Sequence, residues 1–130
     1  MAQEPIELIL MRELAELLAT PIFLVDGAGR LVFYNEPAED LLGRRFDETG
    51  PMAAEEWSTA FGPLDTDGTP MAPADLPLVV ALREGHATHD TFDIRGLDGT
   101  VRRLEATGIP LLDTNGQLVG AAALFWLAEQ

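Results

Sequence analysis

The 130-residue sequence predicts a single α+β domain, in which helices interrupt a five-stranded antiparallel sheet after its second strand. Three observations support this fold class. Residues 4–19 repeat apolar side chains at helical spacing. Two short β-rich runs, "PIFLVD" and "RLVFYN", enclose a turn at Gly27-Ala28-Gly29. Three further β-rich runs after residue 85 are separated by the turn sequences "GLDG" and "DTNG".

The first element, "EPIELILMRELAELLA", is predicted to be an amphipathic helix. Pro21 ends it, because a proline disfavours the helical conformation of the residue before it. About two heptads are too few for a coiled coil that is stable alone, so the helix must pack on its own domain or on a second copy. Its expected apolar stripe consists of Ile6, Leu10, Leu14 and Leu17, widened by Met11 and Leu18.

The stretch "FYNEPAEDLLG" leaves a predicted strand and enters a short helix within two residues. Asn35 or Glu36 is expected to cap this helix, and Pro37 suits its first turn, where a missing N–H costs nothing. Gly43 suits the left-handed conformation that ends a helix. We interpret Asn35 first as a helix cap, with ligand sensing as the alternative.

Residues 46–85 are predicted to contain two further helices. Trp57 and Phe61 share one face of "AAEEWSTAF", at a spacing of four residues. "GPLDTDGTPMAP" has the composition of an ordered loop and lacks the spacing of a calcium-binding loop. "PADLPLVVALRE" is then expected to form the longer helix, which ends at Gly85 and has an apolar stripe made of Leu78, Val79 and Leu82.

The last strand, "QLVGAAALFWLA", is apolar on both faces. A strand with one solvated face alternates apolar and polar residues, so this one should be central and covered on both sides. The helices between strands two and three form one cover. The N-terminal helix, a partner subunit or both must form the other. Alternation places Asp90, Phe92 and Ile94 on one face of the third strand, and Leu104, Ala106 and Gly108 on one face of the fourth.

The composition excludes several classes of function. There are 22 acidic residues against 8 basic ones, all arginine, and the net charge of −14 disfavours nucleic acids and anionic membrane surfaces. The sequence has no cysteine and no lysine, so thiolate and Schiff-base chemistry are excluded. Asp90 and Glu105 are expected on opposite sheet faces and do not form an acid–base pair. We therefore predict no catalytic residues, no metal site and no enzymatic activity.

No run of about 18 apolar residues is present, and the N-terminus lacks the features of a signal peptide. The default expectation is a cytoplasmic protein.

The order of elements resembles the PAS domain family over residues 20–127. The resemblance is carried by "LATPIFLVDGAGRLVFYNEPAEDLLG", "DTDGTPMAPADLPLVVALREG" and "IRGLDGTVRRLEATGIPLLDTNGQLVGAAALFW". It implies a sheet of strand order 2-1-5-4-3 that wraps a helical pocket. It also implies two parts: residues 1–20 as a helix for dimerisation or sheet cover, and residues 21–130 as the sensory domain.

The resemblance further implies the residues that surround such a pocket. These candidates are Tyr34, Asn35, Leu42, Trp57, Phe61, Leu78, Val79, Leu82, Asp90, Phe92, Ile94, Leu104, Ala106, Ala122 and Leu124. Ordinary core packing is the alternative for all of them. The candidates for a dimer interface are Ile6, Leu10, Leu14, Leu17, Ala121, Ala123, Phe125 and Leu127.

The chain also departs from parts of the family. Flavin photoreceptors of this fold need a cysteine beside the flavin, so cysteinyl-flavin photochemistry is excluded. Haem-binding relatives usually carry a histidine on the long helix, whereas His86 here follows Gly85 and His89 is expected on the outward face. Haem binding is therefore not expected, and the cofactor stays open.

The resemblance favours a sensory module that dimerises and relays ligand or partner state to another protein. The alternative is a protein that binds a small apolar or aromatic molecule, or a non-covalent flavin, in an apolar pocket.

Overall fold

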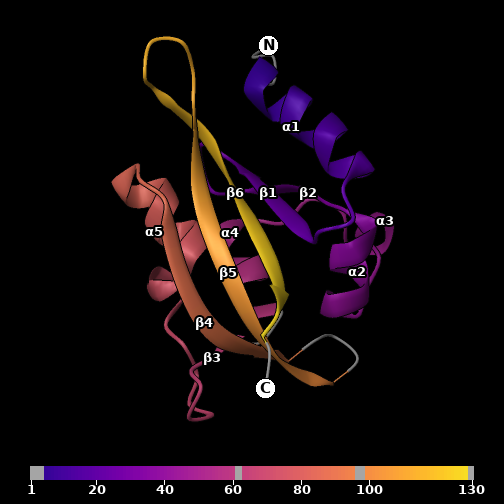
Figure 1. Cartoon of the computed structure of the whole chain (residues 1–130). Coiled ribbons are helices and arrows are strands. Elements are labelled where there is room, and N and C mark those ends of the chain that lie inside the picture. Colours follow the sequence, from indigo (N-terminus) through magenta and orange to yellow (C-terminus); the bar gives the residue numbers. More distant parts are fainter. Residues whose placement is uncertain (1–4, 61–62, 96–98, 129–130) are drawn as a thin grey trace.

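The protein is an α+β domain in which helices cover both faces of one antiparallel sheet (Figure 1). The computed structural model describes residues 5–60, 63–95 and 99–128. The sheet order is β2-β1-β6-β5-β4-β3. The strands are β1 (Ile22–Asp26), β2 (Leu31–Tyr34), β3 (Pro63–Leu64), β4 (Thr88–Arg95), β5 (Val101–Leu112) and β6 (Leu118–Leu127).

The predicted five-stranded sheet is confirmed, with one addition. β3 is a two-residue strand that pairs Pro63 with Ile94 and Leu64 with Asp93 at the edge of the sheet. The antiparallel pairs β1–β2, β4–β5 and β5–β6 are as predicted. The last strand is central, as predicted, because β6 pairs with β1 on one side and β5 on the other.

The helices are α1 (Ile6–Leu17), α2 (Glu36–Leu42), α3 (Phe46–Thr49), α4 (Ala54–Ala60), the 3-10 helix η1 (Pro73–Asp75) and α5 (Pro77–Glu84). α1, α2 and α4 lie where the sequence predicted them, with ends that differ by at most two residues. α5 begins four residues later than predicted, because η1 occupies the start of that segment, and α3 was not predicted. Within the described ranges, no helix is both long and apolar enough to cross a membrane.

The sheet separates two apolar layers. Phe23 and Val25 of β1 face the larger layer, beneath α2, α4 and α5, whereas Ile22 and Leu24 face a smaller layer that contains Ala15 of α1. Successive residues of a strand point to opposite faces, so the same division continues along β6.

The faces that we predicted for residues 121–125 of β6 were wrong, whereas Leu127, predicted for an interface, is 54% exposed. Ala121, Ala123 and Phe125 face the larger layer, whereas Ala122 and Leu124 face α1. Small apolar residues occur on both faces of this strand, so its composition gave no indication of which face each helix layer covers. Ala121, Ala123 and Phe125 are buried among the domain's own helices and cannot form the outer interface expected of them.

The face by which α1 packs on the sheet also differs from the prediction. Leu8 and Ala15 are buried against the sheet, with Met11 and Leu18 partly buried beside them. Leu8 lies over Gly120, where an added Cβ would come within 2.9 Å of Leu8 Cδ2. The apolar stripe that we predicted to meet β6 instead faces outward. Its four residues, Ile6, Leu10, Leu14 and Leu17, are 63%, 56%, 49% and 85% exposed.

Arg12 holds α1 against the edge of the sheet. Its guanidinium donates a 2.7 Å hydrogen bond to the carbonyl of Val32 and lies 5.3 Å from the centre of the Phe33 ring. The position of α1 is thus set by a polar contact as well as by its buried face.

Candidate functional site

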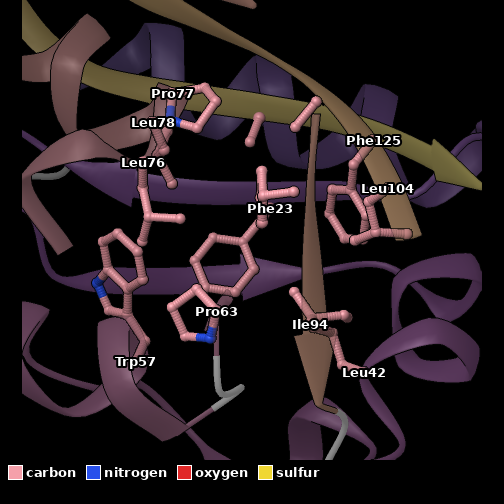
Figure 2. A pocket seen from close by; sticks show the side chains of 13 residues that line it. Phe23, Leu42, Trp57, Pro63, Leu76, Pro77, Leu78, Ile94, Leu104 and Phe125 are labelled. Carbon is pink, nitrogen blue, oxygen red and sulfur yellow. The ribbon is translucent and has the colours of Figure 1, made fainter. Parts of the chain in front are cut away.

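An apolar cavity of about 80 Å³ lies between the sheet and the helices α2, α4 and α5 (Figure 2). Every strand except β2 contributes at least one residue to its wall. The described lining residues are Phe23, Leu42, Trp57, Pro63, Leu76, Pro77, Leu78, Phe92, Ile94, Leu104, Ala106, Ala123 and Phe125. This cavity is the candidate functional site.

Seven of the predicted pocket residues lie in this wall. They are Leu42, Trp57, Leu78, Phe92, Ile94, Leu104 and Ala106. Val79 and Leu82 pack against the same apolar layer but do not line the cavity. Ala122 and Leu124 lie on the other side of the sheet, and Phe61 falls outside the described residues.

Asp90 was expected to face the pocket and is instead exposed. Asp90 lies in β4, four residues before Ile94. The edge strand β3 borders β4 only at Asp93 and Ile94 and does not reach Asp90. Strand alternation gave the correct face for Phe92 and Ile94, but Asp90 lies beyond the part of the strand that the interior covers.

Sequence reasoning missed six lining residues. Phe23 comes from β1, and Ala123 and Phe125 come from β6. Ala123 and Phe125 were missed because the face predicted for β6 was wrong, and Phe23 was missed because no face was predicted for β1. Pro63, Leu76 and Pro77 come from segments that were expected to be loop or helix start, where periodicity carries no signal.

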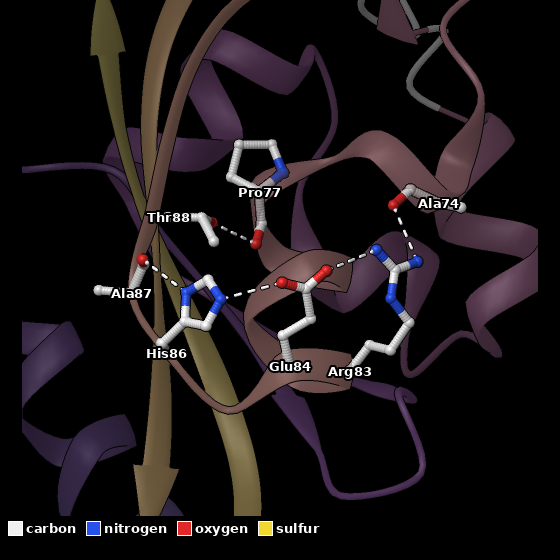
Figure 3. A network of polar contacts seen from close by, with 7 residues as sticks. All are labelled: Ala74, Pro77, Arg83, Glu84, His86, Ala87 and Thr88. Atoms are coloured by element: carbon white, nitrogen blue, oxygen red, sulfur yellow. Dashed lines mark hydrogen bonds and ion pairs between the residues drawn. The ribbon is translucent and has the colours of Figure 1, made fainter.

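A glycine allows α5 to approach the sheet closely enough to form this wall. A Cβ placed on Gly108 of β5 would overlap the Pro77 carbonyl oxygen and lie 2.7 Å from its carbon. Thr88 of β4 also donates a 2.7 Å hydrogen bond to that oxygen (Figure 3). The start of α5 is therefore held directly on two strands.

Polar groups around the cavity are already bound to protein partners. The indole Nε1 of Trp57 donates to the carbonyl of Gly29 at 2.7 Å, and Figure 2 shows this nitrogen turned away from Phe23. The carbonyl of Pro63 accepts a 3.0 Å hydrogen bond from the amide of Met71. Trp57, one of the predicted pocket residues, therefore presents only carbon to the cavity.

Tyr34 lies behind the cavity wall rather than in it. Its ring stacks on Phe23 with centroids 5.8 Å apart, and its hydroxyl donates to the carbonyl of Arg44 at 2.9 Å. Burial raises the pKa of Tyr34, so the phenol stays neutral and acts as a donor. We assign it a structural role.

Asn35 lies at a junction of four segments and is only 2% exposed. Its amide nitrogen donates to the carbonyls of Ala15 at 3.0 Å and Thr20 at 2.9 Å. Its side-chain oxygen accepts from the amides of Ile22 at 3.0 Å and Ala38 at 3.2 Å. The predicted helix cap is therefore confirmed, and the same amide also joins α2 to the end of α1 and the start of β1.

The two histidines lie outside the cavity. His86 contacts the Ala87 carbonyl at 3.1 Å and the Glu84 carboxylate at 2.9 Å (Figure 3), and these two acceptors raise its pKa. His89 lies near Thr107 and Glu105 on the surface. Within the described ranges, no group of three or more acidic or histidine side chains is arranged to hold a metal ion.

The described residues of the cavity do not fit a flavin or a haem. A flavin ring carries nitrogen and carbonyl groups that need hydrogen-bond partners, and the 13 lining side chains drawn in Figure 2 offer only carbon and the bound indole nitrogen. Known small-molecule pockets occupy roughly 300–1,000 Å³. This cavity is much smaller and has no imidazole for a haem iron.

Comparison with protein families gives one match, to the PAS domain, over residues 10–76, which is just over half of the chain. No curated protein matches the chain. The sequence from residue 77 onward lies outside the family match.

Solved structures of low sequence identity share the fold. The PAS domain of Bordetella pertussis BvgS has a TM-score of 0.64 and 22% identity, covering 95% of this chain and 87% of its own. A light-oxygen-voltage domain described with a flavin analogue has a TM-score of 0.68 and 15% identity, covering 94% and 86%. The light-state dimer of the fungal photoreceptor Vivid has a TM-score of 0.64 and 13% identity, covering 83% and 77%.

Proposed function

The chain belongs to the PAS domain family of sensory signal-transduction modules, and we propose that it is a sensor that dimerises and relays the state of its cavity to another protein. The supporting observation is that one buried residue, Asn35, joins the cavity wall to a helix with an exposed apolar stripe.

The cavity is the input of this proposed sensor. Leu42 and Trp57 reach it from α2 and α4, and Leu78 reaches it from α5. A molecule that enters must displace these side chains or shift their helices, because protein interiors are close-packed. The presence of a ligand in the cavity thereby changes the positions of α2, α4 and α5.

Asn35 provides the connection between the cavity and α1. It caps α2, which carries Leu42, and it donates to Ala15 in the last turn of α1. A planar amide that holds all four bonds cannot follow a shift of α2 without straining or breaking its bonds to α1. We place the division between signalling helix and sensory body at residues 20 and 21.

The outward stripe of α1 is the proposed output, and we assign its partner as a second copy of this chain. The stripe consists of Ile6, Leu10, Leu14 and Leu17, while the other side of α1 is already used against the sheet. An exposed run of apolar side chains favours a protein interface. In support, one structural neighbour is described as a dimer.

The charge of α1 predicts how this dimer responds to salt. The helix carries Glu7, Glu13 and Glu16, and its one arginine, Arg12, is bound to Val32. Two such helices repel each other, and salt screens that repulsion. We expect the dimer to tighten as the salt concentration rises.

Sedimentation equilibrium tests this proposal. Leu14→Glu places a charge in the stripe and should shift the protein to monomer. Val101→Glu is the matched control, because Val101 is also 49% exposed but lies at the start of β5. A monomeric wild-type protein, or a Leu14→Glu variant as dimeric as Val101→Glu, would contradict the proposed interface.

The second candidate function is a small-molecule-binding protein without a relay. The observation that favours it is the cavity itself, which exists independently of any partner. Native mass spectrometry separates the two: a monomer that retains a small molecule supports simple binding, whereas a dimer supports the sensory proposal.

A further inference from the structure

We infer that the cavity selects neutral, single-ring aromatic hydrocarbons and excludes molecules that carry hydrogen-bonding groups. This inference rests on the proposed function, in which the cavity is the sensory input. It is argued from the chemistry of the wall, the shape of its aromatic side chains and its volume.

Three described polar groups that border the wall are already bound to protein partners. The Trp57 nitrogen is bound to Gly29, and the carbonyls of Pro63 and Pro77 accept from Met71 and Thr88. Prolines also have no N–H to donate. A hydroxyl or carboxylate brought into this space would lose its hydrogen bonds to water, and these bound groups would not replace them.

The aromatic residues of the wall favour an aromatic guest over an aliphatic one. Phe23, Trp57, Phe92 and Phe125 reach the cavity from four different elements. Phe23 meets Trp57 at an interplanar angle of 63°, so the cavity presents both ring faces and ring edges. A further ring gains stacked and edge-to-face contacts in such surroundings.

The volume limits the guest to one ring. A dry cavity of about 150 Å³ lined by leucine, isoleucine and phenylalanine binds benzene or xenon. At about 80 Å³, this cavity accepts xenon as it stands and needs a small side-chain movement for benzene. Leu76 and Leu78 are the residues expected to move, because they lie on a loop and a short helix rather than in the sheet.

The test is a titration of the full chain with benzene and with phenol, followed by the NMR signals of the cavity methyl groups. Ile94, Leu78 and Leu104 supply those methyls. We expect benzene to bind about tenfold or more tightly than phenol, because the phenol hydroxyl is left without a partner. Xenon should shift the same methyl signals.

Variants of the wall link binding to this cavity. Ala106→Val and Ala123→Val fill it and should weaken benzene binding about tenfold or more, while Leu78→Ala enlarges it and should strengthen binding. Ala87→Val is the matched control, because Ala87 is exposed and lies outside the wall. Two independent filling variants keep the test valid if one of them fails to fold.

Three outcomes would overturn the inference: phenol binding as tightly as benzene, Ala87→Val weakening benzene as much as Ala106→Val, or no methyl shift with either benzene or xenon. Sedimentation of the ligand-free protein tests the dimer separately. A dimer that does not bind benzene would overturn only the ligand class. A monomer that binds benzene would overturn only the proposed relay through α1.

Discussion

Replacing Asn35 should reveal how much of the fold depends on a single amide. In Asn35→Ala, α2 loses its cap, at a cost of about 1 kcal/mol. The buried amide of Ile22 loses its hydrogen-bond partner, at a cost of about 1–3 kcal/mol. The carbonyl of Ala15 keeps a 3.3 Å bond from Leu18, so its loss is smaller.

We expect Asn35→Ala to lower the free energy of unfolding by about 2–4 kcal/mol, a large share of the roughly 5–15 kcal/mol typical of domains. Asn35→Asp separates the two halves of the junction. Its carboxylate still accepts from Ile22 and Ala38, but it faces the carbonyls of Ala15 and Thr20 without a proton to donate. Asn35→Asp should therefore weaken the attachment of α1 and leave the cap of α2 in place.

The aspartate variant also predicts a dependence on pH. Burial beside two carbonyls raises the pKa of the new carboxyl above its unfolded value of about 3.9. Near and below that value the protonated acid regains one donor, so the variant should be closest to wild type. The deficit should grow as pH rises through the folded pKa.

Urea unfolding and hydrogen exchange measure these effects. Exchange of the α1 amides should accelerate in Asn35→Asp while the first turn of α2 stays protected. Asn115→Asp is the control, because Asn115 lies exposed in the β5–β6 turn and should change stability by less than about 0.5 kcal/mol. An Asn35→Ala variant within 1 kcal/mol of wild type would refute the reasoning, as would equal exchange of α1 and α2 in Asn35→Asp.

Two further predictions concern the region around α5. Gly108→Ala should destabilise the protein by about 1–3 kcal/mol in urea, because its Cβ overlaps Pro77, whereas Gly27→Ala meets ordinary 3.7 Å contacts; equal losses in the two variants would contradict the close approach of α5. An NMR titration should place the pKa of His86 above 6.5, and Glu84→Gln should lower it. The small stabilisation from the contact between His86 and Glu84 should be complete below pH 6.5 and lost as pH rises through the pKa of His86 in the folded protein. An unchanged His86 pKa in Glu84→Gln would rule out the ion pair as a contributor.

Local chemistry was predictable from the sequence. Asn35, Pro37 and Gly43 each have one strongly preferred place at a helix end, and the structure puts Asn35 at the cap and Gly43 at φ 81°. These signals need only a few neighbouring residues, so tertiary packing did not override them. Strand order followed from the family resemblance rather than from the residues themselves.

The phases of α1 and β6 were not predictable in the same way. Both elements are apolar on two sides, so hydrophobic periodicity has two solutions of similar quality. The outcome is decided by contacts distant in sequence, such as Leu8 over Gly120. The bond from Trp57 to Gly29 spans 28 residues and likewise had no local signal.

The run of small residues in β6, from Gly120 to Ala123, places odd-numbered residues in one layer and even-numbered residues in the other. Odd positions, Ala121 and Ala123, belong to the layer that contains the cavity, whereas Gly120 and Ala122 determine how closely α1 approaches. One added methyl group at Ala123, which lines the cavity, reduces the cavity volume and does not touch the layer in which α1 packs. The same change at Ala122 falls in the layer shared with α1, whereas at Gly120 it would meet the Val25 carbonyl oxygen of β1 at 2.6 Å as well as Leu8 of α1. Two consecutive residues, Ala122 and Ala123, therefore allow the attachment of α1 and the size of the cavity to be changed separately.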